Sequence, residues 1–339
     1  MTKPALSKAQ SASPENPLDA IGALLAQDLA AVNALILNRM QSSVPLIPEL
    51  AGHLIASGGK RLRPLLTLAT AALFGYTGTR QHKLAACVEF IHTATLLHDD
   101  VVDDSAQRRG KSSANALFGN EAAVLVGDFL FSRSFQLMVE DGSLDVLRIL
   151  SNAAAVIAEG EVLQLSAIGN LDMCRADYMA IIHAKTAELF AAACETGAVV
   201  AGASTKDCAR LRAYGLNLGI AFQISDDVFD YALDGEKLGK DAGNDFREGK
   251  ITLPALIALE KSSDQERAFW HRCFAEGTQE ASDFAQAQEV LKLHSAHKNA
   301  LSEAGRFAQD GKRALENLPA SPLKDLLVRL IDYAATREH

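Results

Sequence analysis

Two apolar helical stretches that each lead into a pair of aspartates constrain this chain more than any other feature. The first runs from Leu84 to Leu97 and continues into Asp99 and Asp103. These two acids are four residues apart, so they share one face of a helix near its C-terminal end. Like charges at that spacing cost roughly 0.2–0.5 kcal/mol per pair, and the helix dipole disfavours anions there. We therefore expect a cation to compensate them.

The chemistry of this first cluster favours Mg²⁺. Carboxylate oxygens are hard ligands, and Mg²⁺ prefers one or two of them together with water and substrate phosphates. Arg108 and Arg109 follow closely, and guanidinium groups bind phosphate oxygens bidentately. A solvated acidic turn that its arginines neutralise explains this single cluster equally well.

A second copy of the pattern favours the metal site. The apolar run from Leu211 to Ile224 leads into Asp226 and Asp230, which are again four residues apart. Two such helices predict opposing carboxylate walls around a metal-bound diphosphate.

Composition and periodicity predict one large all-α domain. The chain has 339 residues, of which 48% are hydrophobic and 6% aromatic, and no alternating strand pattern is evident. Residues 1–17 are polar and rich in Ser, Ala and Pro, so we expect a disordered tail followed by the helical domain at 18–339. We expect helices at 16–40, 48–57, 60–75, 83–104, 121–140, 144–168, 174–202 and 206–231, with three or four more after residue 251.

Charge and cysteine content exclude several classes of protein. A formal net charge of -9 argues against nucleic-acid binding, which depends on clustered Lys and Arg. Five scattered cysteines without metal-type spacing indicate reduced thiols in a cytoplasmic protein. We found no run of about 18 uncharged apolar residues, so no transmembrane helix is predicted.

Several polar residues stand out on otherwise apolar helices. His92 lies two turns before Asp99 on the same stripe, and either a core role or a ligand-binding role fits it equally well. Lys185, next to Thr186, is flanked by apolar residues and is expected to meet an anion inside rather than reach out to solvent. Gln223 shares a face with Asp226; its ordinary role would be a hydrogen bond between helices.

Three further segments carry candidate residues. Gly58-Gly59-Lys60-Arg61-Leu62-Arg63 combines flexible backbone, cations and a helix start, which predicts an anion pocket. Lys240 and Lys250, in or beside a loop rich in Gly, Asp and Lys, are expected to close over the diphosphate, although lone lysines are more often solvated. Asp128 is expected to be a structural acid, paired in the core with Arg133.

These motifs, taken together and in order, resemble the trans-prenyl diphosphate synthases. The resemblance covers essentially residues 18–333 and includes the Gly-Gly-Lys-Arg segment, both acidic motifs, Lys185-Thr186 and Gln223. It implies a helical bundle of the isoprenoid-synthase type with a central cavity, usually a homodimer. The implied reaction is Mg²⁺-dependent head-to-tail condensation of isopentenyl diphosphate with an allylic diphosphate.

The resemblance also implies a role for each motif residue. Mg²⁺ would be bound by Asp99, Asp103, Asp226 and Asp230. The allylic diphosphate would be held by Arg108, Lys185, Gln223 and Lys240, and isopentenyl diphosphate by Lys60, Arg63, His92 and Arg109. Thr186 and Gln223 would help stabilise the allylic cation, and the departing pyrophosphate would take the proton.

Product length is expected to depend on residues just before the first acidic motif. In the family, bulky aromatics four or five positions before the first acid stop chain growth, and this chain has Thr95 and Ala94 there. It therefore resembles the long-chain branch, of which octaprenyl synthases are typical. Phe131 or Phe135 would form the floor, and Ala94→Phe should shorten the product.

Other functions stay open at this point. A shorter-chain farnesyl or geranylgeranyl diphosphate synthase, a head-to-head condensing enzyme and a terpene cyclase are the nearest alternatives. A non-catalytic regulatory subunit is another, although such subunits tend to lose one acidic motif. The long apolar chain of the implied product suggests transient membrane contact during its release.

Overall fold

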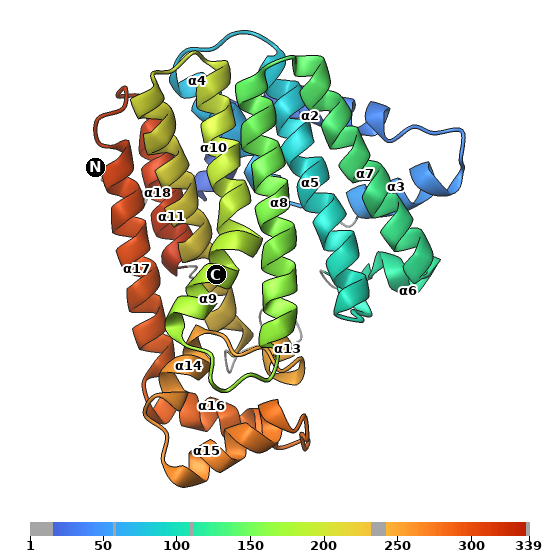
Figure 1. Cartoon of the computed structure of the whole chain (residues 1–339). Helices are drawn as coiled ribbons and strands as arrows, with labels where there is room; N and C mark the ends of the chain where they lie inside the picture. The colour runs from blue at the N-terminus through green and yellow to red at the C-terminus, as the bar shows by residue number, and fades with distance from the viewer. Residues whose placement is uncertain (1–15, 57–58, 109–110, 232–241, 337–339) are drawn as a thin grey trace, which may run out of the picture.

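The computed structural model of the chain describes residues 16–56, 59–108, 111–231 and 242–336, which are almost entirely helical (Figure 1). The described elements are α1 Pro17–Leu24, α2 Ala26–Arg39, α3 Leu46–Ala56, α4 Leu62–Leu73, α5 Arg80–Val102, β1 Gln107–Arg108, β2 Lys111–Ser112, α6 Ala114–Phe118, α7 Asn120–Asp141, α8 Leu144–Ala167, α9 Arg175–Ile182, η1 His183–Ala187, α10 Glu188–Val200, α11 Thr205–Asp230, α13 Asn244–Arg247, α14 Leu253–Leu259, α15 Asp264–Trp270, η2 His271–Ala275, α16 Asp283–Leu293, α17 Ala296–Leu315 and α18 Pro322–Thr336.

The long helices run side by side in one bundle, and the short helices α13, α15 and α16 gather at one end (Figure 1). Helix α11 packs against α10 and α17, α5 packs against α7, and α10 packs against α4. Large side chains such as Phe90, Phe190 and Tyr214 are almost fully buried between these helices. The predicted all-α bundle is therefore confirmed.

The N-terminal helix begins as predicted but bends. Asn16 caps it by accepting a hydrogen bond from the Leu18 amide, with Pro17 at the first helical position. The expected single helix over 16–40 is nevertheless wrong, because α1 and α2 meet at 83°. Leu25, at the break, leaves helical geometry and buries its side chain in the core.

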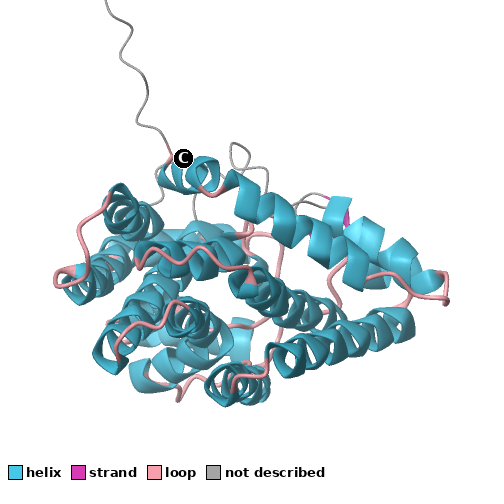
Figure 2. Ribbon diagram, turned by 90° about the horizontal axis from the view of Figure 1, so that it is seen from above, coloured by secondary structure: helices cyan, strands magenta, loops and turns pink. Residues whose placement is uncertain are grey.

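Two other local features differ from the expectation. The helix predicted over 174–202 contains a five-residue π-helical turn, η1, between α9 and α10. A two-stranded antiparallel pair, drawn in magenta in Figure 2, follows α5 and pairs Gln107 with Ser112 and Arg108 with Lys111. The π-helical turn packs closely against Gly160 of α8, a contact that local periodicity does not record, whereas the strand pair is a short local hairpin without an alternating pattern.

Helix α7 is apolar enough to pass a test for membrane spans, with a mean hydropathy of 1.4 over an 18-residue window. In the folded chain 44% of that window is buried, and α7 packs along α5. A core helix of a water-soluble protein meets the same length and composition criteria, so this feature is weak evidence for a membrane span.

Candidate active site

The first acidic motif lies at the C-terminal end of α5, and each of its two predicted metal ligands faces a lysine. Asp99 Oδ2 lies 3.6 Å from Lys185 Nζ. Asp103 Oδ2 accepts a hydrogen bond of 2.9 Å from Lys250 Nζ. Three of these four side chains were expected to share a site, and Lys250 was expected to close over it. The structure brings all four together.

Lys185 lies in the π-helical turn η1, pressed against α8. A Cβ added to Gly160 on α8 would lie 2.8 Å from the Lys185 backbone nitrogen, so only glycine allows this close approach. The neighbouring Glu161 accepts a 2.6 Å hydrogen bond from Lys185 Nζ. Lys185 therefore meets anions inside the bundle, as predicted, and π-helical turns are often found at functional sites.

The surroundings of Glu161 disfavour the ionised form of its carboxyl group. Burial and the negative charge of Asp99 raise its pKa to about 7, although Lys185 opposes the shift. A cation bound beside Glu161 would lower this pKa again, because an opposite charge favours the ionised form of a carboxyl group.

Lys250 is half-buried and held by two carboxylates. Its ammonium group lies 2.7 Å from Glu248 Oε2 as well as 2.9 Å from Asp103. Burial lowers the pKa of Lys250, but Asp103 and Glu248 outweigh burial and raise it above its ordinary value. The alternative that Lys250 is merely solvated is wrong.

An ion pair and two hydrogen bonds together connect the two acidic motifs. Thr186, the residue after Lys185, donates from Oγ1 to Gln223 Oε1 at 2.8 Å. Gln223 then donates from Nε2 to Asp227 Oδ1 at 2.7 Å. Because Lys185 is close to Asp99, the adjacent residues Lys185 and Thr186 connect the C-terminal end of α5 to the second motif on α11. Gln223 thus makes the helix-to-helix hydrogen bond that is its ordinary role.

The second motif has a different environment. Asp227 is 3% exposed, and its other oxygen accepts a 2.6 Å hydrogen bond from Tyr178 OH. Burial raises the pKa of Asp227 to about 7, while Tyr178 and Gln223 oppose the shift. Asp230 accepts from the backbone amides of Asn244 and Asp245 at 3.2 and 3.0 Å, and burial raises its pKa too.

These carboxylates fit Mg²⁺ by their chemistry and by their excess negative charge. Asp245 adds another carboxyl group beside Asp227 and Asp230, and burial followed by these neighbours raises its pKa well above the ordinary value. In the part of the chain that the structure describes, no three His, Cys, Asp or Glu side chains are placed to hold an ion by themselves. The fit rests on the oxygen donors and on their need for a counter-cation.

Gly59, Lys60 and Arg61, the described part of the Gly-Gly-Lys-Arg motif, form a basic stretch directly before α4. Arg63 lies with its Nη1 3.0 Å from His92 Nε2, and its guanidinium stacks 4.4 Å from the Phe190 ring centre. Two residues predicted to share an anion pocket are therefore adjacent. Arg61 adopts φ 49° and instead pairs with Glu89 on α5.

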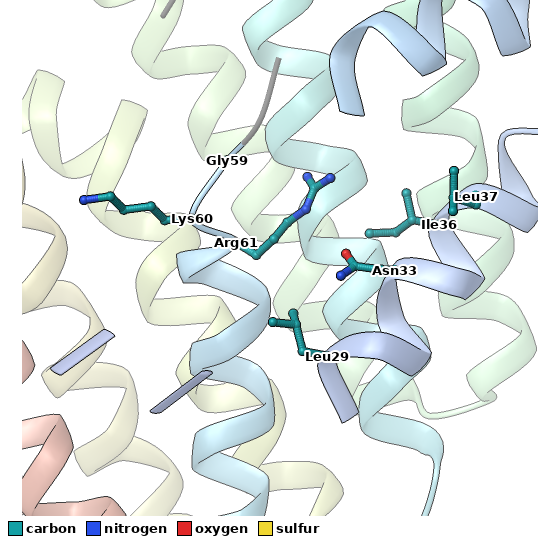
Figure 3. Close-up of a pocket in the computed structure, with 7 residues that line it drawn as sticks. All are labelled: Leu29, Asn33, Ile36, Leu37, Gly59, Lys60 and Arg61. Atoms are coloured by element: carbon teal, nitrogen blue, oxygen red, sulfur yellow. The ribbon is translucent and has the colours of Figure 1, made fainter. Parts of the chain in front are cut away.

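The side chains of Lys60 and Arg61 point in different directions (Figure 3). With Gly59 they border a cavity of about 400 Å³ whose other wall comes from α2, through Leu29, Asn33, Ile36 and Leu37. Arg63, in the first turn of α4, faces His92, whereas Arg61 borders the α2 cavity.

Some predicted residues lie outside the described part of the chain. Arg109 and Lys240 fall there, and of Arg108 only the backbone is described, in β1. One structural expectation is wrong: Asp128 is exposed and lies 3.5 Å from His98, whereas Arg133 bonds to Gln136.

Sequence reasoning missed Glu161, Tyr178, Asp227 and Glu248. One signal for Glu161 was available, because a glycine inside an apolar helix indicates a close approach by another segment, and Gly160 precedes it. The partnership of Tyr178 with Asp227 spans 49 residues and leaves no local signal.

The fold and the site together define a class: helical-bundle enzymes with two acidic motifs, the first of which lies beside lysines suited to bind diphosphates. A sequence profile described as polyprenyl synthetase matches residues 44–291. The chain therefore belongs to the polyprenyl synthetase family and is a prenyltransferase.

Named relatives support this assignment over nearly the whole chain. An octaprenyl diphosphate synthase of Escherichia coli (strain K12) is 43% identical over 321 residues, covering 95% of this chain and 99% of the relative. The crystal structure of a decaprenyl diphosphate synthase from Rhodobacter capsulatus superposes with a TM-score of 0.92 at 49% identity, covering 95% of this chain and all of that one. A polyprenyl synthase from Caulobacter crescentus CB15, complexed with calcium and isoprenyl diphosphate, also gives 0.92, at 51% identity and 97% coverage of this chain.

Proposed function

We propose that this enzyme makes a long-chain, octaprenyl-class trans-polyprenyl diphosphate, which serves as a quinone side chain, by adding isopentenyl diphosphate units to an allylic diphosphate in the presence of Mg²⁺. The observation that carries the proposal is the line from Asp99 through Lys185-Thr186 and Gln223 to Asp227. It joins the acids of α5 to those of α11 across the end of one apolar bundle.

The acidic residues of the site would bind Mg²⁺, and the basic residues would bind the diphosphate. Asp99 and Asp103 on one wall, and Asp226 and Asp230 on the other, would hold Mg²⁺, which supplies positive charge to the leaving diphosphate. Lys185 would turn from its carboxylate partners to the allylic diphosphate, aided by Arg108 and Lys240. Lys250, which contacts Asp103, would bind the same diphosphate.

The allylic cation would form among neutral groups. Thr186 and Gln223 present oxygen atoms that are already oriented by their mutual hydrogen bond, and preorganised dipoles stabilise developing charge without further reorganisation. Lys60, Arg63, His92 and Arg109 would bind isopentenyl diphosphate, so that its double bond attacks the cation. The departing pyrophosphate then takes the proton.

A direct experiment tests this reaction. The purified chain is incubated with labelled isopentenyl diphosphate, farnesyl diphosphate and Mg²⁺, and the products are sized after dephosphorylation. We expect products of the octaprenyl class, loss of synthesis with EDTA and recovery with Mg²⁺. Turnover of the allylic diphosphate alone would indicate a cyclase, and inactivity with both substrates would indicate a regulatory subunit.

The expected product length rests on small side chains before the first acid. Thr95 is half-buried, but Ala94 is fully buried. Both Thr95→Phe and Ala94→Phe should shorten the product, and Ala94→Phe should also destabilise the fold by about 1–3 kcal/mol through overpacking. Phe131 is half-buried and suits the floor better than the more exposed Phe135. Unchanged product lengths from both variants would remove this part of the proposal.

A homodimer is supported by the outer face of α7. Val124, Leu125, Phe135 and Val139 lie exposed on that face, and Leu125 and Val139 are 67% and 69% exposed. Exposed apolar residues that share one helix face often mark protein interfaces. Leu125→Glu with Val139→Glu should convert the dimer to a monomer in sedimentation velocity measurements. We further propose a cytoplasmic location, with transient membrane contact when the product leaves.

A further inference from the structure

Residues 243–250 touch both acidic motifs. The amides of Asn244 and Asp245 bind the two carboxylate oxygens of Asp230, and the Gly243 amide binds the Asp230 carbonyl at 2.7 Å. Seven residues after Gly243, Lys250 reaches Asp103. The position of this short segment therefore affects the geometry of both walls of the site.

The other side of the segment rests on what we call the C-terminal unit, residues 264–293 (α15, η2 and α16). Phe246 is 1% exposed, and its ring lies 6.5 Å from that of Trp270, 5.5 Å from Phe274 and 5.9 Å from Phe284. Gly243 has φ +83°, and a Cβ there would come within 2.6 Å of the Phe284 ring. The segment is thus seated on an aromatic cluster that the unit provides.

One polar side chain fixes the backbone of the segment to that unit. Gln279, in the loop between η2 and α16, donates from Nε2 to the carbonyls of Phe246 at 2.9 Å and Cys273 at 3.1 Å. It bridges the centre of the segment and the π-helical turn η2 with a single amide. Contacts between apolar rings allow the segment to shift along the unit, whereas the two hydrogen bonds from Gln279 are directional and fix the position of the Phe246 carbonyl.

We propose that Gln279 is a positioning residue for the diphosphate site, acting through the Phe246 carbonyl on the amides that bind Asp230 and on Lys250 above Asp103. The proposal rests on the proposed function, since it concerns the same metal and diphosphate site. Changing residues that orient the ligands of a metal site without binding the metal typically costs about 10- to 100-fold in affinity or activity.

The test compares Gln279→Met with Gln286→Met. Methionine keeps the length of the side chain and removes its N–H donors, and Gln286 is an exposed glutamine of α16 in the same unit. Calorimetry measures the binding of inorganic pyrophosphate in the presence of Mg²⁺, and steady-state kinetics measure KM for each substrate. The emission of Trp270, the sole tryptophan of the chain, reports whether the aromatic cluster stays intact.

We expect Gln279→Met to weaken pyrophosphate binding about 10-fold or more. The KM for isopentenyl diphosphate should stay unchanged, because its proposed ligands Arg63 and His92 belong to α4 and α5 rather than to residues 243–250. Gln286→Met should behave like the parent protein. Unchanged pyrophosphate affinity, or an equal loss for both substrates, overturns the proposal.

If Gln279→Met loses its cooperative unfolding transition, the shorter amide Gln279→Asn is measured under the same criteria. A parent enzyme that binds pyrophosphate but makes no polyprenyl product would count against the proposed function. The binding comparison would still decide the role of Gln279.

Discussion

The two acidic motifs share one sequence pattern but differ in what surrounds their carboxylates. Asp99 and Asp103 on α5 lie beside the ammonium groups of Lys185 and Lys250. In the second motif, Asp227 and Asp230 accept hydrogen bonds from a phenol, a side-chain amide and backbone amides, which are all neutral donors.

This difference teaches that two motifs with similar sequences need not have the same charge balance. Cations at the first motif offset part of its charge, whereas burial among neutral donors leaves the second motif with carboxyl groups whose pKa values are raised. The first motif can exchange a lysine partner for a substrate phosphate, whereas the second depends more on an added cation. The following variants test that contrast, from the largest effect to the smallest.

The largest effects are expected from the predicted metal ligands themselves. Asp99→Asn and Asp226→Asn should each lower kcat by about 100- to 1,000-fold, because each removes a charge that would hold Mg²⁺. The magnesium concentration for half-maximal rate should rise more in Asp226→Asn. Asp104→Asn is the matched control, since Asp104 is exposed, has φ 48° and asparagine tolerates that backbone. A control that loses as much activity would contradict the assignment.

Loss of the cation at the first motif should have the next largest effect. Lys185→Met leaves Glu161 and Asp99 without their shared ammonium group, so we expect kcat to fall about 10- to 100-fold. Steady-state kinetics with the allylic substrate measure this, with Lys206→Met on the exposed start of α11 as the control. Normal kinetics in Lys185→Met would show that Lys185 only pairs with Glu161 and does not contribute to catalysis.

At the second motif a neutral donor can be removed with little change in shape. Tyr178→Phe leaves one oxygen of buried Asp227 without its phenol donor, and hydrogen bonds to charged groups contribute about 1.5–3 kcal/mol. We expect a loss of that size in the free energy of unfolding measured in urea. Tyr76→Phe, on the loop after α4, serves as the reference, and equal stability of both variants would contradict the role given to Tyr178.

The smallest effect concerns the C-terminal unit that supports the second motif. Hydrogen bonds from Arg272 lower the pKa of Asp283 from 3.8 to about 2. A carboxyl group with a lowered pKa stabilises the fold above its ordinary pKa, and that contribution disappears as the pH falls through the folded value. Asp283→Asn should therefore lower Tm at neutral pH, and the difference should shrink between pH 4 and pH 2. A Tm difference that does not depend on pH would exclude this linkage.

Sequence alone predicted the helices and the main charged residues because both leave local patterns. The aspartates of each pair are four residues apart, and the start at Asn16-Pro17 follows from capping chemistry. The bend at Leu25 was missed because burial against distant helices decided it. The partnership of Tyr178 with Asp227 was missed because it requires knowing which helices are neighbours.

The π-helical turn at Lys185 also changes how the neighbouring sequence must be aligned. Such a turn contains one residue more than regular helix needs, which rotates everything beyond it by roughly 100° relative to an uninterrupted α-helix. A helical wheel drawn through residues 174–202 would therefore assign the wrong face to half of them. Deleting one alanine, such as Ala184, would return the segment to regular pitch and turn Thr186 away from Gln223, so this helix tolerates substitutions better than changes in its length.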